Sequence, residues 1–334
     1  MSLNNYNYLS DESIVKNETI NCRLTINYDE SYSKFYPEIN KNNVALFSTY
    51  PEHDYTSVKR AICKKYNLDQ VILGSGNEDF IIRINRLIKD KKWKVGIVLP
   101  IFYRTIETCS RFSQIMEKNL FKEDLEEYDF VWINNPNLFT GKTHTRDSLI
   151  ELIKKYPKTI FGIDEAAIFS IPEWKQHTLT GHCKDLNNVV LLNSFSKMFG
   201  IAGLRAAFAS GNSDILDEIE KIGPTFPYNS VAELFVRTIL VDDNILKSIH
   251  GKIKNNKEKF IEILRKRNIE AVPSMVNCVF FKNQEFRKIL ERLGILCLDL
   301  DGQIGMEDKG VTRMTVYSSE KVFTEILNRL ANEK

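Results

Sequence analysis

One lysine, Lys197, lies in a short stretch whose residue types could carry covalent chemistry. Residues 193–205 read NSFSKMFGIAGLR, so hydroxyl groups, glycines and Arg205 surround this lysine. A lysine buried among apolar side chains is costly to keep as a cation, so its pKa falls and its neutral amine can form a Schiff base. The hydroxyl groups and the arginine can donate to an anion. The more ordinary alternative is a lysine whose amine reaches the surface.

Two further features could complete such a site. Asp164 ends the apolar run FGID, 33 residues before Lys197, although an aspartate in this position ordinarily caps a turn or helix. The sequence GSGNE over residues 74–78 lies between a short apolar run and an amphipathic helical pattern. Because free amides at a helix N-terminus favour an anion, we expect this turn to bind one. Taken alone, two glycines at this spacing are a weak signal.

The elements that must position these residues alternate between strand and helix from about residue 55. Several of the expected strands are apolar throughout, which is typical of strands buried on both faces of a parallel sheet. We expect strands over residues 70–73, 95–99, 130–134, 159–163, 189–193 and 204–209. The alternation predicts an α/β fold, an open sheet with helices on both faces that binds ligands at the carboxyl ends of its strands.

A turn-rich segment at residues 223–227 marks a change of organisation. Beyond it we expect a long helix over about 243–267, followed by the strands and helices of a smaller α+β domain. The expected division is a large domain over residues 46–224 and a small, discontinuous domain built from residues 1–45 and 225–334.

The composition excludes several classes of protein. The chain has 334 residues, 43% hydrophobic and 27% charged, which allows a sizeable core and excludes a disordered or fibrous protein. The formal net charge is +2 with both signs spread along the chain, so we expect no nucleic-acid surface. Six cysteines without a Cys-x-x-Cys pair predict reduced thiols and no metal site. The polar N-terminus lacks a signal-peptide pattern and no apolar run could span a membrane, so we expect a cytoplasmic protein.

The lysine stretch closely resembles the Ser-x-Ser-Lys-x-x-Gly-x-x-Gly-x-Arg signature of fold-type I pyridoxal-phosphate enzymes. Among them, the chain resembles the class I/II aminotransferases and their histidinol-phosphate aminotransferase branch. This resemblance implies a mostly parallel seven-stranded sheet sandwiched by helices, a smaller α+β domain and pyridoxal 5′-phosphate as cofactor. Lys197 would hold the cofactor as a Schiff base, and Asp164 would pair with the protonated nitrogen of its ring.

The same resemblance implies the remaining contacts. The cofactor phosphate would lie against a turn and three side chains, and the candidates are Gly76, Asn77, Glu78, Ser194, Ser196 and Arg205. Phe102, two residues after Pro100, would stack on the ring. Arg313, in the expected strand VTRMTV, would bind the substrate carboxylate. Tyr50, in the segment TYP, would reach the site of a neighbouring subunit, which implies a homodimer with shared sites.

The chain departs from the family pattern at three places. The family's NPxNPTG segment reads NPNLFTG here, so the asparagine that donates to the cofactor's phenolic oxygen is replaced by Leu138. A tyrosine that often donates to the same oxygen is replaced by Ala167. Asn135, Asn137 or water would have to substitute, and we keep Asn137 as a candidate cofactor contact. Residues 294–298 read GILCL where the histidinol-phosphate branch has Gly-Ile-x-Val-Arg, and the missing arginine argues against histidinol phosphate as substrate.

These residues predict a pyridoxal-phosphate-dependent aminotransferase that acts on a small amino acid or amine by ping-pong transfer, with freed Lys197 moving the proton. One alternative is a decarboxylase of an amino acid or phospho-amino acid on the same fold, which the missing phenolate donors favour. A second is a regulatory or scaffold protein without turnover. Retention of Lys197, Asp164, Arg205 and Arg313 argues against that reading.

Overall fold

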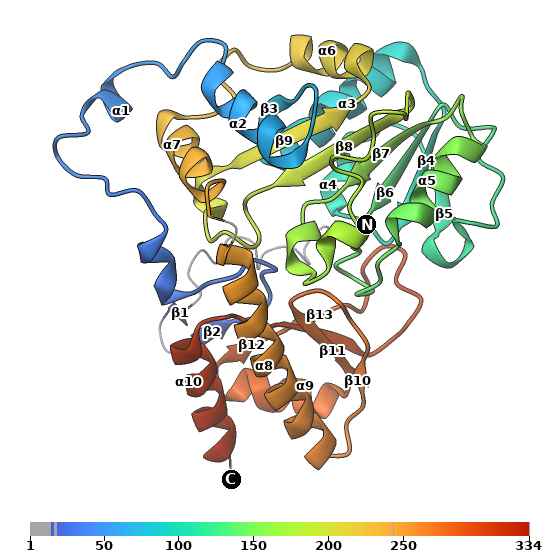
Figure 1. The fold of residues 1–334 in the computed structure, drawn as a ribbon. Helices are drawn as coiled ribbons and strands as arrows, with labels where there is room; N and C mark the ends of the chain where they lie inside the picture. Colours follow the sequence, from blue (N-terminus) through green and yellow to red (C-terminus); the bar gives the residue numbers. More distant parts are fainter. Residues whose placement is uncertain (1–14, 17–18, 243, 334) are drawn as a thin grey trace.

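The structure is a computed structural model that describes residues 15–16, 19–242 and 244–333. Its larger part is a twisted sheet with helices on both faces, and its smaller part lies beneath the edge of that sheet (Figure 1). Among the described residues, no helix combines the length and apolar character needed to cross a membrane.

The larger part is built on a seven-stranded sheet with the order β3-β9-β8-β7-β6-β4-β5. Its strands are β3 (Ile72–Ser75), β4 (Val95–Leu99), β5 (Ser113–Met116), β6 (Phe130–Asn134), β7 (Ile160–Asp164), β8 (Val189–Ser194) and β9 (Ala206–Gly211). Within this sheet only β9 runs antiparallel to its neighbours, which confirms the expected mostly parallel α/β fold. The apolar pattern predicts six of these strands and misses β5, where Ser113 and Gln114 are exposed.

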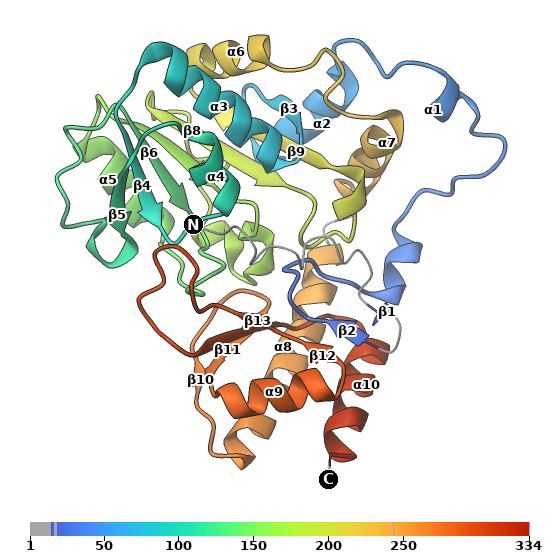
Figure 2. The same cartoon turned by 180° about the vertical axis from the view of Figure 1, so that it is seen from behind.

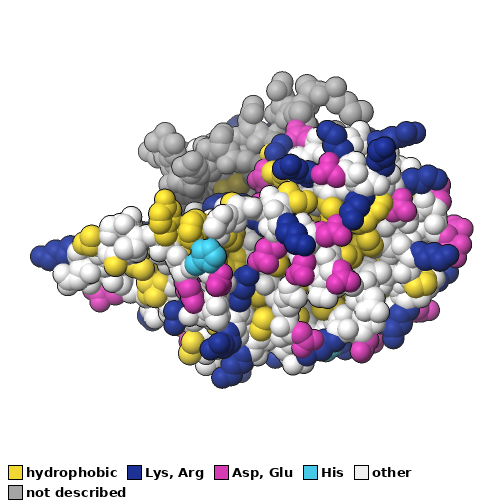
Figure 3. Space-filling view, turned by 90° about the horizontal axis from the view of Figure 1, so that it is seen from above, with side chains coloured by type: hydrophobic (Ala, Val, Ile, Leu, Met, Phe, Trp, Pro, Cys, Tyr) yellow, Lys and Arg dark blue, Asp and Glu magenta, His cyan; other side chains and the backbone are white. Residues whose placement is uncertain are grey.

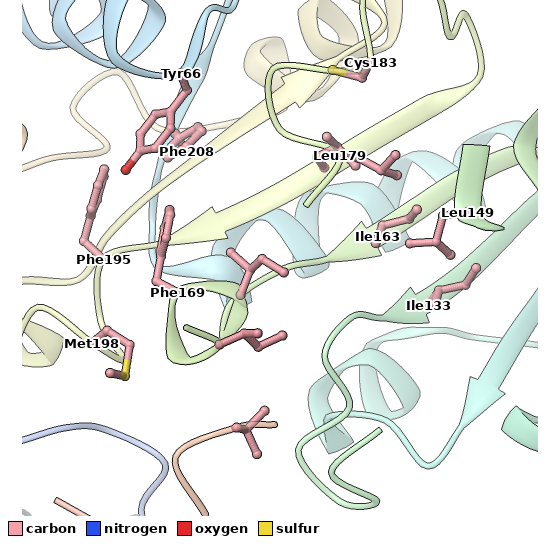
Figure 4. Packing of buried hydrophobic residues seen from close by; sticks show 14 of the residues in the cluster. Tyr66, Ile133, Leu149, Ile163, Phe169, Leu179, Cys183, Phe195, Met198 and Phe208 are labelled. Carbon is pink, nitrogen blue, oxygen red and sulfur yellow. The ribbon is translucent and has the colours of Figure 1, made fainter. Parts of the chain in front are cut away.

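Helices cover both faces of the sheet, as Figures 1 and 2 show from opposite sides. One face carries α2 (Thr56–Tyr66), α5 (Arg146–Lys155) and α7 (Ser230–Ile239), and the other carries α3 (Asn77–Lys91), α4 (Tyr103–Thr108) and α6 (Ser213–Ile222). In β8, Val189 and Leu191 pack into the first layer, seen close up in Figure 4, while Val190 and Leu192 pack into the second. Burial on both faces explains why these strands are apolar over most of their length.

The smaller part contains two small sheets with the orders β10-β11-β14-β13 and β1-β2-β12. Their strands are β1 (Val15–Lys16), β2 (Thr19–Asn21), β10 (Ala271–Val272), β11 (Cys278–Lys282), β12 (Ile295–Leu296), β13 (Leu298–Asp299) and β14 (Val311–Thr315). Three helices, α8 (Asn244–Lys266), α9 (Gln284–Arg292) and α10 (Glu320–Ala331), enclose their core. Because β2 pairs with β12, the N-terminal segment packs on the C-terminal elements.

The passage from the larger to the smaller part follows α7. This helix comes after the turn-rich segment, yet it packs against α2 and β9 of the larger part. We therefore propose that the small domain resumes between α7 and α8 rather than at residue 225. The remaining elements are the short helix α1 (Ala45–Ser48) and the 3-10 turns η2 (Glu30–Lys34), η3 (Glu117–Asn119), η4 (Ile168–Ser170), η5 (Trp174–Gln176) and η6 (Ala202–Leu204).

Candidate active site

A pocket of about 450 Å³ lies where the carboxyl ends of the central strands meet the smaller part. Open parallel sheets bind their ligands at this edge. Most of the residues that we single out from the sequence line it: Asn77, Glu78, Phe102, Asp164, Ser194, Ser196, Lys197, Arg205 and Arg313. The pocket combines apolar walls with a few convergent charged groups, as small-molecule sites do.

Lys197 is anchored in the pocket by its chain neighbours. Phe195 and Met198 are fully buried and belong to the hydrophobic cluster that Figure 4 shows. The partly buried Lys197 side chain is therefore left on the pocket side. Desolvation and then the positive charge of Arg313 lower the pKa of Lys197 to about 8. At neutral pH a fraction of the lysine amine is therefore uncharged and can act as a nucleophile.

The N-terminal segment holds the loop that carries Lys197. The backbone amide of Asn27 donates to the Lys197 carbonyl at 2.5 Å. The hydroxyl of Tyr32 donates to the Met198 carbonyl, and that of Tyr36 donates to the Phe199 carbonyl at 3.0 Å. Three successive carbonyl groups of the lysine loop are thus held by the N-terminal segment.

Asp164 ends β7 and faces the same pocket. Burial raises the pKa of Asp164, while hydrogen bonds from Asn77 and Ala166 oppose that rise. The Asn77 side-chain amide donates to Asp164 Oδ1 at 2.6 Å, and the Ala166 backbone amide donates to the same oxygen at 2.9 Å. No hydrogen bond from the described residues is assigned to Oδ2, which leaves this oxygen for a donor in the pocket.

The turn before helix α3 and the lysine loop form a cradle for an anion. Gly76 precedes the helix with φ +81°, and α3 begins at Asn77, so its first amides have no intrahelical acceptor. A Cβ at Gly76 would lie 2.2 Å from Arg205 Nη2, so the backbone and the guanidinium are in close approach. Ser196 Oγ is buried without a hydrogen-bond partner among the described residues. These donors fit a phosphate group.

Substituting Gly76 with alanine is expected to weaken binding of pyridoxal phosphate, the cofactor that the resemblance implies, by about 10- to 100-fold, because the new methyl group strains the backbone and displaces Arg205. Fluorescence titration of the apoenzyme with pyridoxal phosphate measures this dissociation constant. Gly203→Ala is the matched control, because a Cβ at Gly203 meets nothing within 4 Å. Equal affinity of the Gly76 variant and wild type would rule out the phosphate cradle.

Arg313 reaches the pocket from β14. Its Nη1 donates to the Leu138 carbonyl and its Nη2 to the Arg23 carbonyl, both at 2.8 Å. Its Nε is buried without a hydrogen-bond partner among the described residues. Two backbone carbonyls thus fix the guanidinium plane while donors remain for a carboxylate.

The polar residues after β6 are hydrogen-bonded to the backbone, whereas we expect from the sequence that one of them contacts the cofactor. Asn137 does not line the pocket, because its amide donates to the Pro100 carbonyl at 2.8 Å and its Oδ1 accepts from the Phe139 backbone. Asn135 is likewise engaged with the backbone of His144 and His177. Neither side chain is therefore placed to replace the donors missing at positions 138 and 167.

Asn134 is a pocket residue that the sequence reasoning misses. It ends β6 directly beside Asp164, its partner in the parallel β6 and β7 pair. Its Oδ1 is buried without a hydrogen-bond partner among the described residues. The position of Asn134 could have indicated its role, because Asn134 and Asp164 both end buried strands that should be neighbours.

Tyr50 lies outside the pocket. It is 82% exposed and stacks on Phe226, with ring centroids 4.9 Å apart. It belongs to an arm around α1 that projects from the body, and apolar side chains gather along this arm in Figure 3. The exposed apolar residues of the arm are Val44, Phe47 and Tyr50.

The sheet, the lysine loop, the buried Asp164 and the anion cradle together define a pyridoxal-phosphate enzyme of fold type I. The chain belongs to the class I and II aminotransferases, whose family model matches residues 37–330. It is accordingly a pyridoxal-phosphate-dependent aminotransferase. This confirms the family, the cofactor and the class of enzyme that the sequence motifs indicate.

Similar proteins agree with this assignment. Histidinol-phosphate aminotransferase from Staphylococcus haemolyticus is 26% identical over 258 residues, 73% of each chain, and that from Leuconostoc citreum is 23% identical over 310 residues, 88% of each chain. Two solved structures share the fold. The histidinol-phosphate aminotransferase of Clostridium acetobutylicum (TM-score 0.79, 22% identity) covers 93% of this chain and 97% of its own, and the L-threonine-O-3-phosphate decarboxylase of Porphyromonas gingivalis (TM-score 0.79, 20% identity) covers 93% and 98%.

Proposed function

We propose that this aminotransferase acts on a small amino acid or amine, with Lys197 as the residue that anchors the cofactor and moves the proton. One observation carries the proposal: an amine whose pKa is lowered to about 8 shares a pocket with a buried carboxylate and a fixed guanidinium. This set of groups matches what amino transfer on pyridoxal phosphate requires.

Each residue has a distinct task in this proposal. Pyridoxal phosphate, when bound, supplies a sink for the electron pair left at the substrate Cα. Asp164 would keep the ring nitrogen of the cofactor protonated, and Phe102 would help to hold the ring. Lys197 Nζ would accept the proton from the substrate Cα and return it during transfer. Arg313 binds the substrate carboxylate and so orients Cα.

The substrate is proposed to differ from histidinol phosphate. The position of the arginine in the histidinol-phosphate branch is occupied by Leu298, which is buried in the core. A buried leucine cannot bind a phosphate. We therefore do not assign to this chain the substrate that the relatives' names give.

Mixing the holoenzyme with single amino acids, without a keto acid, separates the two reactions possible on this cofactor. For a substrate, we expect one equivalent of keto product per site and conversion of the cofactor spectrum to its pyridoxamine form. Adding 2-oxoglutarate or pyruvate should then allow repeated turnover. Release of carbon dioxide without keto product would instead favour decarboxylation.

We also propose a homodimer in which Tyr50 completes the site of the partner. The support is the exposed apolar arm, since such a patch on a soluble chain commonly marks an interface. Sedimentation velocity should give twice the monomer mass, and Tyr50→Phe should weaken cofactor binding without changing that mass. A monomer that is fully active at all concentrations would contradict the proposal.

Cofactor capture by the apoenzyme should depend on pH through Lys197. With a pKa of about 8, roughly one amine in ten is neutral at pH 7, against fewer than one in a thousand at the ordinary value. The rate of covalent capture, followed by absorbance in stopped flow, should rise with pH and level off above about 8. Free Nα-acetyl-lysine is the control and should still accelerate there. Arg313→Gln removes a positive neighbour, so it should move the midpoint to higher pH; no movement would contradict the electrostatic cause.

A further inference from the structure

The side chain of Asn77 has a role that the anion cradle does not explain. Its backbone amide lies at the start of α3, where the cradle needs it, but its side chain is hydrogen-bonded to residues of β7 and β8. Its amide nitrogen donates to Asp164 Oδ1 at 2.6 Å and to the Leu192 carbonyl at 3.1 Å. The side chain thus links the phosphate end of the pocket to the carboxylate end.

The orientation of this amide is fixed by its partners. Only the NH2 group can donate to both a carboxylate and a carbonyl, so the amide oxygen must point elsewhere. Asn77 is 8% exposed, and its Oδ1 is buried without a hydrogen-bond partner among the described residues. Leaving a buried acceptor unsatisfied costs free energy, which indicates that the donation to Asp164 offsets that cost.

The two donors to Asp164 bind the same oxygen of its carboxylate and leave the other one free of them. The amides of Asn77 and Ala166 both donate to Oδ1, so they fix the plane of the group and leave Oδ2 toward the pocket. Donors to a carboxylate also make it a weaker base. A proton shared between this carboxylate and a ring nitrogen therefore stays on the nitrogen, where it strengthens the electron sink.

We propose that Asn77 is a positioning residue that holds Asp164 ionised and oriented, so that the cofactor ring nitrogen remains protonated. This inference rests on the proposed role of Asp164.

The test measures the protonation state of the cofactor's ring nitrogen directly. Holoenzyme is prepared with pyridoxal phosphate labelled with 15N in the ring, and the nitrogen resonance is compared among variants by NMR. Asn77→Ala should move the resonance toward that of an unprotonated pyridine, and kcat should fall by about tenfold because a charge-assisted hydrogen bond is lost. Asn77→Ser keeps a polar side chain that is shorter than the amide which reaches Asp164, and it should behave like the alanine variant.

Asn85 offers a matched control on the same helix. It is buried, and its side-chain amide donates to the Thr105 carbonyl and to Thr108 Oγ1, far from Asp164 in the hydrogen-bond network. Asn85→Ala should lower stability but leave the 15N resonance unchanged. An Asn77→Ala resonance identical to wild type would overturn the inference.

Asp164→Asn separates this inference from the proposed function. If that variant loses ring protonation while Asn77→Ala keeps it, the role of Asp164 stands and only the role of Asn77 fails. If Asp164→Asn also keeps the wild-type resonance, the assignment of Asp164 fails, and the inference on Asn77 fails with it.

Discussion

Lys197→Ala is expected to lower kcat/KM for transamination by about 10³-fold or more. The substitution removes the amine that anchors the cofactor and the base that moves the proton at the substrate Cα, and proton transfer by a positioned base alone contributes about 10²- to 10⁴-fold. Transfer of the amino group to a keto acid, measured by a coupled assay with excess pyridoxal phosphate, gives this value.

Lys257 supplies the matched control for this substitution. Burial lowers the pKa of Lys257 too, and its amine donates to the Ser274 and Val276 carbonyls, away from the residues that line the pocket. Lys257→Ala should change kcat/KM by no more than a few fold below its melting temperature. Comparable losses in both variants would mean that the effect at position 197 is structural.

Asp164→Asn is expected to lower kcat by about 10²- to 10³-fold, the range found when one preorganised electrostatic partner is removed. The amide is similar in size to the carboxylate, so the pocket is preserved, but it cannot stabilise a positive charge on the ring nitrogen. Pre-steady-state absorbance should show that formation of the keto product, rather than substrate binding, is slowed.

Glu165→Gln is the control for Asp164→Asn. Glu165 is the next residue and is fully buried, and its carboxylate accepts from Thr178, Thr180, Asn193 and the Leu179 backbone. Its contacts are structural, so its substitution should lower the melting temperature and leave kcat nearly unchanged. An active Asp164→Asn enzyme would exclude Asp164 as the partner of the ring nitrogen.

The sequence can predict the apolar strands, and it can predict the pocket residues that lie at fixed spacings from one another along the chain. Strands such as β4 and β6 are buried on both faces, so hydrophobic residues occupy most of their positions and mark the strands in the sequence. Lys197 and Asp164 follow or end such strands, and strand ends of a parallel sheet converge on one edge. Edge strand β5 has exposed polar residues, so the pattern carries no signal for it.

The sequence cannot predict contacts that depend on the direction in which a side chain points. Asn137 stands in the motif expected to contact the cofactor, but its amide is bound to the Pro100 carbonyl. Asn77 occupies a turn expected to contribute only its backbone, yet its side chain reaches Asp164, 87 residues further along the chain. Such contacts depend on tertiary packing between distant segments, which residue spacing does not encode.

Peptide mass spectrometry of the holoenzyme after reduction with borohydride identifies the lysine that holds the cofactor. Reduction makes the bond between the cofactor and its lysine permanent, so proteolysis yields one pyridoxyl-labelled peptide. We expect the label on Lys197 and its loss in Lys197→Ala, while Lys257→Ala should be labelled like the wild type. A label on any other lysine, or none at all, would contradict this expectation.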